Sequence, residues 1–235
     1  MAQTLEKSNI FLTEEQLDQF DKYYDLLVEW NSFMNLTGIT EYDEVLLKHF
    51  IDSLLVDEIF PLKGDKETSI IDVGTGAGFP GLPLKIAFPN NRVVLLDSLN
   101  KRINFLNEVI NQCGLSNIET IHGRAEDYAG KADYRECFDL AVSRAVANLA
   151  TLTEYCLPYV KCGGCFIAYK SGEYKEELDN ALKAIQILGG KVSKIHTFTL
   201  PNSDIERSFI VIEKIKQTPK KFPRKAGLPS REPLS

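Results

Sequence analysis

The 235-residue sequence lacks several features that would place it in a special class. It has no apolar run of about 18 residues, so it predicts no membrane-spanning helix. Met1 to Leu12 carries charges and has no apolar signal core, so no secretory signal is expected. The five cysteines are odd in number and scattered, which argues against a disulfide framework and favours a reducing compartment. These features predict a cytoplasmic protein with one large domain, or one domain with an appendage.

Residues for metal or redox chemistry are also scarce. His49, His122 and His196 lie far apart in the sequence, and no Cys or His pairs have zinc-ligand spacing, so no metal site is predicted. His49 falls on a helical stripe and is interpreted as a packing residue in preference to a catalyst. Cys162-Gly163-Gly164-Cys165 has redox spacing, but a strand follows it where a thioredoxin-type motif has a helix. We interpret its glycines as a helix-to-strand turn.

Charge is distributed unevenly along the chain. The net charge is −6, yet seven of the 27 Lys and Arg residues lie between Lys214 and Arg231, where there is no acid. An acidic body with a basic end favours one localised contact with a polyanion, although a disordered, solubilising terminus has the same composition. The interleaved Phe222 and prolines favour the contact, because prolines stiffen a segment and an aromatic ring can stack.

The order of secondary structure predicts an α/β fold. Thr13 to Gln16 has capping-box spacing before an amphipathic helix, and a second helix is expected over about 42–60. From residue 69 strands alternate with helices, which implies parallel crossovers, and the last two strands form an antiparallel edge hairpin. Strands are predicted at 69–74, 92–97, 118–122, 138–143, 164–170, 192–199 and 208–214, and helices at 81–88, 100–113, 146–160 and 173–188. We expect a helical extension over 1–64, a core over 65–216 and a basic tail over 217–235.

The strongest motif is the glycine-rich loop that follows the first of these strands. Gly74, Gly76 and Gly78 alternate at the carboxyl end of the strand, where open α/β sheets bind ligands. Asp97 ends the next strand, where an acid can accept hydrogen bonds from both ribose hydroxyls. The alternative is a tight turn without a ligand. The combination favours a site for a nucleoside cofactor.

The bulk of this loop indicates which cofactor. Residues 76–81 fit the dinucleotide pattern G-x-G-x-x-G, but Phe79, Pro80 and Pro83 make a loop poorly shaped for a diphosphate. Asp72 would also repel a diphosphate. An acid there suits a cofactor with an ammonium or sulfonium group, and S-adenosylmethionine carries both.

Two later segments fall where such a cofactor would need contacts. Ala125 and Glu126 or Asp127 follow the third strand and are candidates for the adenine edge; the alternative is that the acids complement a helix dipole. Arg144 ends the fourth strand near the expected methyl group; the alternative is a salt bridge to a nearby acid.

With these motifs assembled, the sequence resembles the bacterial small-subunit ribosomal RNA guanine-N7 methyltransferases, also called glucose-inhibited division protein B. The resemblance extends over most of the chain and includes a histidine segment, the glycine loop, an arginine motif and a Pro-Arg tail. The residues that carry it are Trp30-Asn31, Asn35-Leu36-Thr37, His49, Asp52-Ser53-Leu54, 72–81, Asp97-Ser98, Lys101-Arg102, Phe105-Leu106, 143–147 and 219–225.

The resemblance implies a class I methyltransferase (Rossmann-like) fold, a doubly wound, mostly parallel seven-stranded sheet with an N-terminal helical extension. It implies methylation of N7 of one guanine in 16S ribosomal RNA near the decoding site, with S-adenosylmethionine as cofactor. Since N7 has its own lone pair, direct in-line transfer needs no base, and Arg144 is a candidate for positioning only. The cofactor residues expected from the motifs and the resemblance are Asp72, Gly74, Gly76, Gly78, Phe79, Asp97, Ala125, Glu126 and Arg144.

The expected partner is 16S ribosomal RNA or the small ribosomal subunit. Binding to DNA or to a membrane is not expected, and the protein is expected to be a monomer. The hypothesis for RNA contact names Lys220, Lys221, Arg224 and Lys225, with Lys170 and Arg207 extending the patch. Two other functions compete with this one: a non-catalytic RNA-binding or ribosome-binding module on a methyltransferase fold, and an NAD-dependent oxidoreductase.

Overall fold

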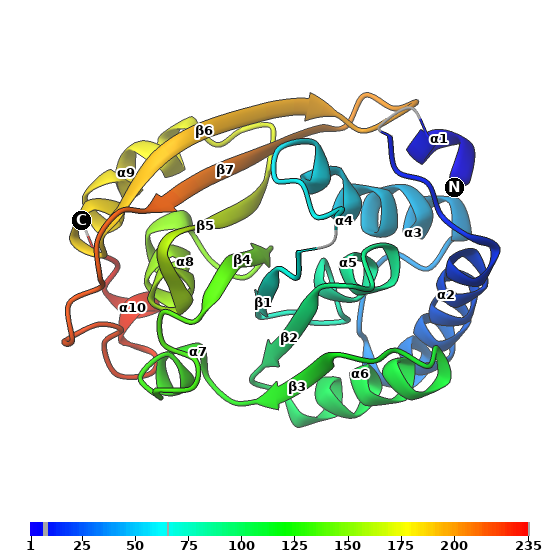
Figure 1. Ribbon diagram of the computed structural model, residues 1–235, viewed down its shortest axis with the longest axis horizontal. Coiled ribbons are helices and arrows are strands. Elements are labelled where there is room, and N and C mark those ends of the chain that lie inside the picture. Colours follow the sequence, from blue (N-terminus) through cyan, green and yellow to red (C-terminus); the bar gives the residue numbers. More distant parts are fainter. Residues whose placement is uncertain (7–8, 65, 235) are drawn as a thin grey trace.

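The computed structural model describes residues 1–6, 9–64 and 66–234. In these ranges seven strands form one sheet in the order β3-β2-β1-β4-β5-β7-β6, and β7 runs antiparallel to the other strands (Figure 1). This topology confirms the predicted doubly wound sheet with an antiparallel edge pair. The strands are β1 (Ser69–Val73), β2 (Arg92–Asp97), β3 (Ile118–His122), β4 (Phe138–Arg144), β5 (Val160–Ser171), β6 (Gly190–Thr199) and β7 (Glu206–Lys214).

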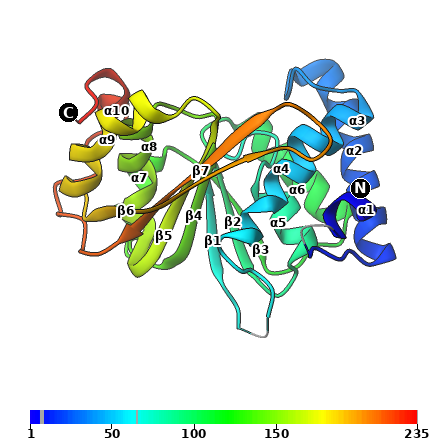
Figure 2. The same cartoon turned by 90° about the horizontal axis from the view of Figure 1, so that it is seen from above.

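The central strands are apolar on both faces because helices cover both (Figure 2). Alternate residues of a strand point to opposite faces, so Ile70 and Leu95 join one core while Ile71 and Leu96 join the other. The first core also receives α5 (Gly81–Ala87), α6 (Asn100–Gln112) and the N-terminal helices. The second receives α8 (Leu149–Cys156) and α9 (Lys175–Ile187).

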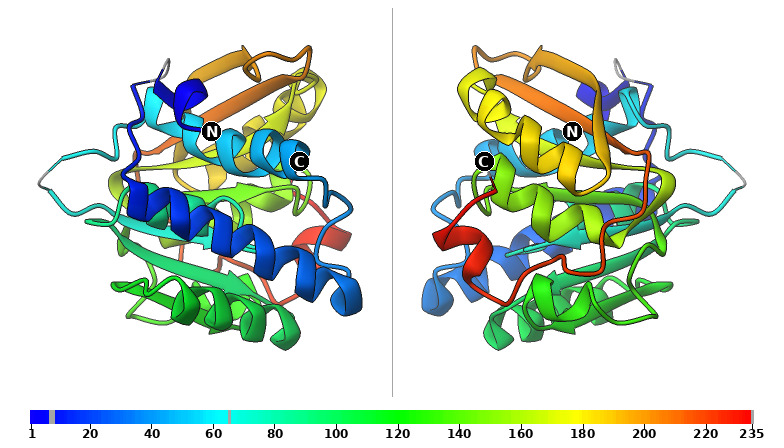
Figure 3. Two further views of the ribbon diagram at one scale, coloured as in Figure 1. Left: turned by 90° about the vertical axis from the view of Figure 1, so that its right-hand side faces the viewer. Right: turned by 90° about the vertical axis from the view of Figure 1, so that its left-hand side faces the viewer.

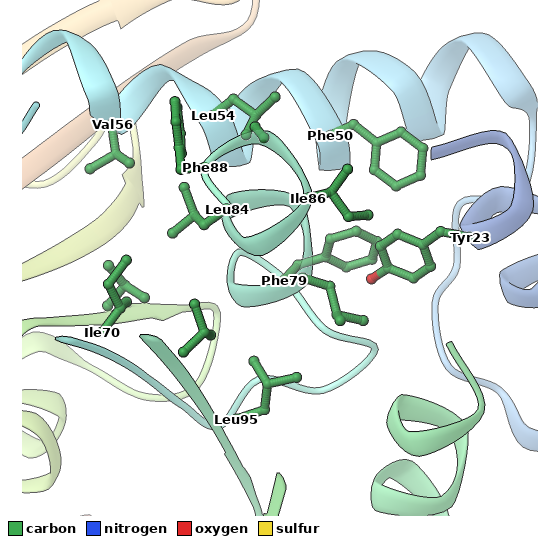
Figure 4. Close-up of a cluster of buried hydrophobic side chains, with 14 of the residues drawn as sticks. Tyr23, Phe50, Leu54, Val56, Ile70, Phe79, Leu84, Ile86, Phe88 and Leu95 are labelled. Carbon is green, nitrogen blue, oxygen red and sulfur yellow. The ribbon is translucent and has the colours of Figure 1, made fainter. Parts of the chain in front are cut away.

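The N-terminal helices pack on the first core as part of one apolar cluster. After the short α1 (Ala2–Glu6), α2 (Glu14–Met34) begins with the expected capping box at Thr13. Tyr23 of α2 lies against the rings of Phe50 and Phe79 (Figure 4). Through these rings α2 contacts the glycine-loop region directly. In Figure 3 (left) α2, in dark blue, runs obliquely across the side of the molecule that faces the viewer.

The helical segment predicted over 42–60 is present, but it changes its winding. It consists of α3 (Tyr42–Val45), a π-helical turn (Leu46–Ile51), α4 (Asp52–Leu54) and a 3₁₀ turn (Leu55–Glu58). A π-helical turn widens a helix locally and is frequent at functional sites. His49 lies within this turn.

The helices differ from the sequence-based prediction in two places. The helix predicted over 146–160 begins only at Leu149, since the Asn148 side chain accepts a hydrogen bond from Thr151 N–H and caps it. It ends at Cys156 and continues as a 3₁₀ turn (Leu157–Tyr159). The sequence analysis also missed α7 (Ala125–Tyr128), which is too short for a periodic pattern.

The Cys162–Cys165 motif lies within β5, which already begins at Val160, so it is not the predicted helix-to-strand turn. Gly163 has φ +86°, and the pairing of β4 with β5 shifts register here, as in a bulge. Burial raises the pKa of the Cys165 thiol to about 12, which keeps it protonated and unreactive.

The C-terminal segment, defined here as residues 217–231, packs along α7 and α8 and includes α10 (Leu228–Arg231). Figure 1 shows it beside these two helices. Two residues of the segment itself, Phe222 and Pro229, are buried against the body of the protein. Within the described ranges no helix is long and apolar enough to cross a membrane.

Candidate functional site

A cleft of about 770 Å³ opens at the carboxyl ends of β1, β2 and β4. The chain crosses to opposite faces of the sheet on either side of β1, so this is the topological switch point where open α/β sheets bind ligands. Most of the residues predicted for the site line this cleft: Gly74, Gly76, Phe79, Asp97, Ala125, Glu126, Arg144, Lys170 and Arg207. The lining does not include Asp72 or Gly78.

The glycine loop forms the floor of the cleft. Gly74 and Gly76 have φ of +75° and +63°, a backbone conformation that is strained for residues with a side chain. Hydrogen bonds from Gly74 N–H (2.8 Å) and Thr75 N–H (3.1 Å) to Leu96 O fasten the loop to β2. A Cβ on Gly74 would lie 2.5 Å from a methyl group of Val146, so glycine keeps room under that side chain.

Gly78 serves the packing behind the loop. A Cβ on it would approach Leu82 to 2.4 Å and the Tyr23 hydroxyl to 2.7 Å, so glycine is needed for α2 and α5 to close on the loop. Gly78 was predicted to contact a cofactor, but it does not line the cleft.

Asp97 stands at the end of β2 as the sequence predicts, and its carboxylate is fixed in place. Oδ2 accepts hydrogen bonds from Gly76 N–H (2.9 Å) and Arg102 (3.2 Å), and Oδ1 accepts one from Leu99 N–H (2.9 Å). Only 3% of the residue is exposed. A carboxylate held this firmly at the mouth of a nucleoside site suits recognition of ribose hydroxyls.

Asp72 was expected to face the cofactor, but it is fully buried beneath the loop. Its Oδ2 accepts hydrogen bonds from the Thr75 hydroxyl (2.7 Å) and Gly81 N–H (2.8 Å), so it ties the loop to the start of α5. Its Oδ1 has no hydrogen-bond partner among the described residues. Burial raises the pKa of this carboxyl to about 7, although both hydrogen bonds oppose the shift.

Arg144 reaches across the cleft to the N-terminal helical segment. Its Nη1 donates to Lys48 O and to Asp52 Oδ2, both at 3.0 Å. The alternative of a salt bridge is therefore what the structure contains. The guanidinium also lies 5.1 Å from the ring centre of Phe79.

Asp52 is shared between two arginines. Its second oxygen lies 3.4 Å from Nε of Arg207, and the residue is only 2% exposed. Lys170, also in the cleft, donates to Ala147 O (3.0 Å) and Glu177 (2.7 Å). Two arginines thus share one buried acid at this end of the cleft, and Lys170 lines the same cleft with Glu177 as its partner.

His49 also lines this end of the cleft, in addition to packing. Its Nε2 lies 3.0 Å from the Thr37 hydroxyl, and its ring stacks on Phe79 at 4.5 Å. Burial, reinforced by Arg144, lowers the pKa of His49 to about 4, so the ring is neutral at pH 7. The sequence analysis did not name Thr37, His49 or Asp52 as site residues, although all three carried the family resemblance.

The other end of the cleft is closed by α7. Ala125 and Glu126, the candidates for the adenine edge, line this end of the cleft. Glu126 is 8% exposed, and its Oε1 accepts a hydrogen bond from Gly227 N–H at 2.8 Å. The acid is thus joined to the C-terminal segment.

The tail cations predicted to bind RNA fall into two groups. Lys220, Lys221 and Lys225 are exposed on the C-terminal segment. Arg224 is instead bonded to Glu154, which is fully buried. Within the described ranges no cluster of His, Cys, Asp or Glu could hold a metal ion.

Comparison with known proteins gives a consistent result. A family model described as rRNA small subunit methyltransferase G matches residues 16–209. Two curated relatives carry the name ribosomal RNA small subunit methyltransferase G. The one from Lachnoclostridium phytofermentans is 58% identical over 99% of this chain and 95% of its own length. The one from Acetivibrio thermocellus is 56% identical over 95% of this chain and 91% of its own length.

Solved structures share the fold at low identity. A putative S-adenosyl-L-methionine-dependent methyltransferase from Methanococcus maripaludis matches with TM-score 0.55 and 19% identity, over 74% of this chain and 91% of its own. TYW2 from M. jannaschii, solved in complex with AdoMet, matches with TM-score 0.56 and 12% identity, over 76% of this chain and 80% of its own. These likenesses concern the fold, which is that of class I methyltransferases.

Proposed function

The chain belongs to the rRNA small subunit methyltransferase G family, and from that membership we propose that it methylates N7 of one guanine in 16S ribosomal RNA near the decoding site. It is an S-adenosylmethionine-dependent methyltransferase that acts on small-subunit ribosomal RNA. The finer parts of the proposal are the N7 atom, the site in the RNA and the roles of individual residues.

The observation that carries the proposal is the fit of the cleft to S-adenosylmethionine. Gly74 and Gly76 turn with positive φ and add no side chain of their own to the floor. Asp97 stands rigidly at the end of the neighbouring strand, in reach of a ribose. We propose that Gly74, Gly76, Phe79, Asp97 and Ala125 contact the cofactor, and that Asp72 acts from below by holding the loop.

The chemistry needs little from the protein beyond placement. S-adenosylmethionine supplies an electrophilic methyl group on a sulfonium. Guanine N7 carries a free lone pair in the major groove, so no side chain has to remove a proton first. The chain's task is therefore to position the base and to stabilise the arrangement electrostatically.

The cationic end of the cleft suits a phosphate-bearing substrate. Arg144, Arg207 and Lys170 supply positive charge there, and Asp52 holds the two arginines in place. His49 stays neutral at pH 7, so it adds no charge beside the cationic purine that N7 methylation creates. We propose that Arg144 positions the target nucleotide against the Phe79–His49 stack.

A-form RNA hides N7 in a deep and narrow groove. We therefore propose that the target guanine is unpaired or splayed out when it enters the cleft. The exposed Lys220, Lys221 and Lys225 would then hold neighbouring phosphates. We also propose that the reaction takes place in the cytoplasm, since the proposed substrate is ribosomal RNA.

The test is transfer of labelled methyl groups from S-adenosylmethionine to purified 16S ribosomal RNA and small subunits, followed by nucleoside analysis. Label in 7-methylguanosine is expected. Label in another nucleoside would overturn the N7 assignment, and confirmed cofactor binding without any label would favour a binding module.

A matched pair of arginine variants tests the site. Arg144→Ala should lower kcat/KM about 100-fold, the cost of a misplaced substrate. Arg92→Ala removes a half-buried arginine that pairs with Glu119 at the start of β2, outside the cleft lining, and should leave kcat/KM unchanged. Equal activity of the two variants would contradict the role of Arg144.

A further inference from the structure

The C-terminal segment is tied to the body of the protein at three places. The first is Arg135, whose guanidinium donates to Thr218 O at 2.7 Å and to Phe222 O at 2.9 Å. These bonds hold the beginning of the segment, and the buried Phe222 packs beneath it. Figure 3 (right) shows the segment, in orange-red and red, on the side of the molecule that faces the viewer.

The second attachment is the ion pair between Arg224 and Glu154 of α8. Arg224 Nε lies 2.9 and 3.1 Å from the two carboxylate oxygens, Nη2 lies 2.7 Å from one of them, and Arg224 N–H donates to the same group at 2.8 Å. Glu154 is fully buried, so the arginine neutralises a carboxylate that would otherwise be unpaired inside the protein. Glu154 raises the pKa of Arg224 further, as expected for a bidentate pair.

The third attachment reaches the cleft itself. Gly227 N–H donates at 2.8 Å to Oε1 of Glu126, a residue of α7 that lines the cleft. Two residues farther on, Pro229 O accepts from the Thr151 hydroxyl of α8 at 3.0 Å. The segment therefore spans from α8 to the wall of the cleft, with Arg224 three residues before the Gly227 contact.

We propose that Arg224 is a positioning residue of the cofactor site and not an RNA contact. Its pair with Glu154 docks the C-terminal segment so that Gly227 N–H fixes Glu126 and, with it, α7 at the adenine side of the cleft. This inference rests on the proposed cofactor. The segment lies beyond residues 16–209, which match the family model.

The lysines next to Arg224 differ from it in exposure and in charge pairing. Lys221 and Lys225 flank Arg224 on the same segment and are exposed, whereas Arg224 has its charge engaged by Glu154. The lysines thus bind RNA phosphates, whereas the arginine holds the C-terminal segment against the cofactor site. Adjacent cations in one short segment therefore act on different ligands.

The test compares Arg224→Ala with Lys225→Ala in the full-length protein. Binding of S-adenosylmethionine and S-adenosylhomocysteine is measured by calorimetry, and KM for each substrate by methyl transfer. Arg224→Ala should raise the dissociation constant and KM for S-adenosylmethionine about fivefold, the effect of one lost hydrogen bond, with KM for RNA unchanged. Lys225→Ala should leave cofactor affinity unchanged, raise KM for RNA and lower the salt slope of RNA binding by about one.

Arg224→Lys protects the test against misfolding, because it keeps a cation beside the buried Glu154. Lysine cannot form the bidentate pair, so KM for S-adenosylmethionine should still rise, by less than in Arg224→Ala. An increase in KM for RNA with normal cofactor affinity would overturn the proposal, and so would no change in either. If the unaltered protein itself failed to bind S-adenosylmethionine, the proposed function would be the part that is wrong.

Discussion

The buried Asp72 carboxyl makes the stability of this protein depend on pH. Its pKa is raised from 3.8 to about 7, first of all by burial, while the bonds from Thr75 and Gly81 oppose the shift. A raised pKa means that the folded state holds this proton more tightly than the unfolded state. The contribution of the group to stability is therefore largest below pH 3.8 and is lost progressively as pH rises toward 7. Asp72→Asn removes this titration.

The size of the effect follows from the two pKa values. Between pH 5 and pH 8 a carboxyl with these values lowers the free energy of unfolding by about 2.5 kcal/mol. An asparagine at the site can still accept both hydrogen bonds through its oxygen. Its amide nitrogen would take the position of Oδ1, which has no partner among the described residues, at a cost of about 1–3 kcal/mol that does not depend on pH.

The measurement is urea unfolding of the wild type and Asp72→Asn at several pH values from 5 to 8. The difference between the two profiles isolates Asp72, because other titrating groups are common to both proteins. The variant should gain about 2.5 kcal/mol relative to the wild type across this range. Parallel profiles would refute the argument, since they would mean that the carboxyl is already ionised at pH 5.

Two further predictions concern the same region. Gly81→Ala places a Cβ 2.3 Å from a methyl group of Leu95 and should lower the free energy of unfolding in urea by about 1–3 kcal/mol. The control Gly130→Ala, whose Cβ would have nothing within 4 Å, should change that free energy by less than about 0.5 kcal/mol. Equal costs for the two variants would contradict the packing argument. His49 has a pKa lowered to about 4, so the unfolded state binds its proton more tightly and stability should rise with pH between 4 and 6.5. His49→Gln should reduce that rise by about 2.5 kcal/mol, and an unchanged rise in urea unfolding would count against it.

The sequence by itself determined the order of the elements and the type of ligand. Strands and helices follow from local apolar patterns, so β1, β2 and the glycine loop lie where they were predicted. Gly74, Gly76 and Asp97 were identifiable because a positive φ and a strand-end acid are local requirements. The family resemblance, which depends only on residue identity, is confirmed by the comparisons.

Only the tertiary structure decided how distant residues meet. Arg144 pairs with Asp52, 92 positions away, and Arg224 pairs with Glu154, 70 positions away. Sequence spacing cannot indicate such contacts, because they depend on how helices cover the sheet. The structure also placed Asp72 beneath the loop, where burial and not charge attraction governs its pKa. Local chemistry could be predicted from the residues, whereas burial and pairing are properties of the packed chain.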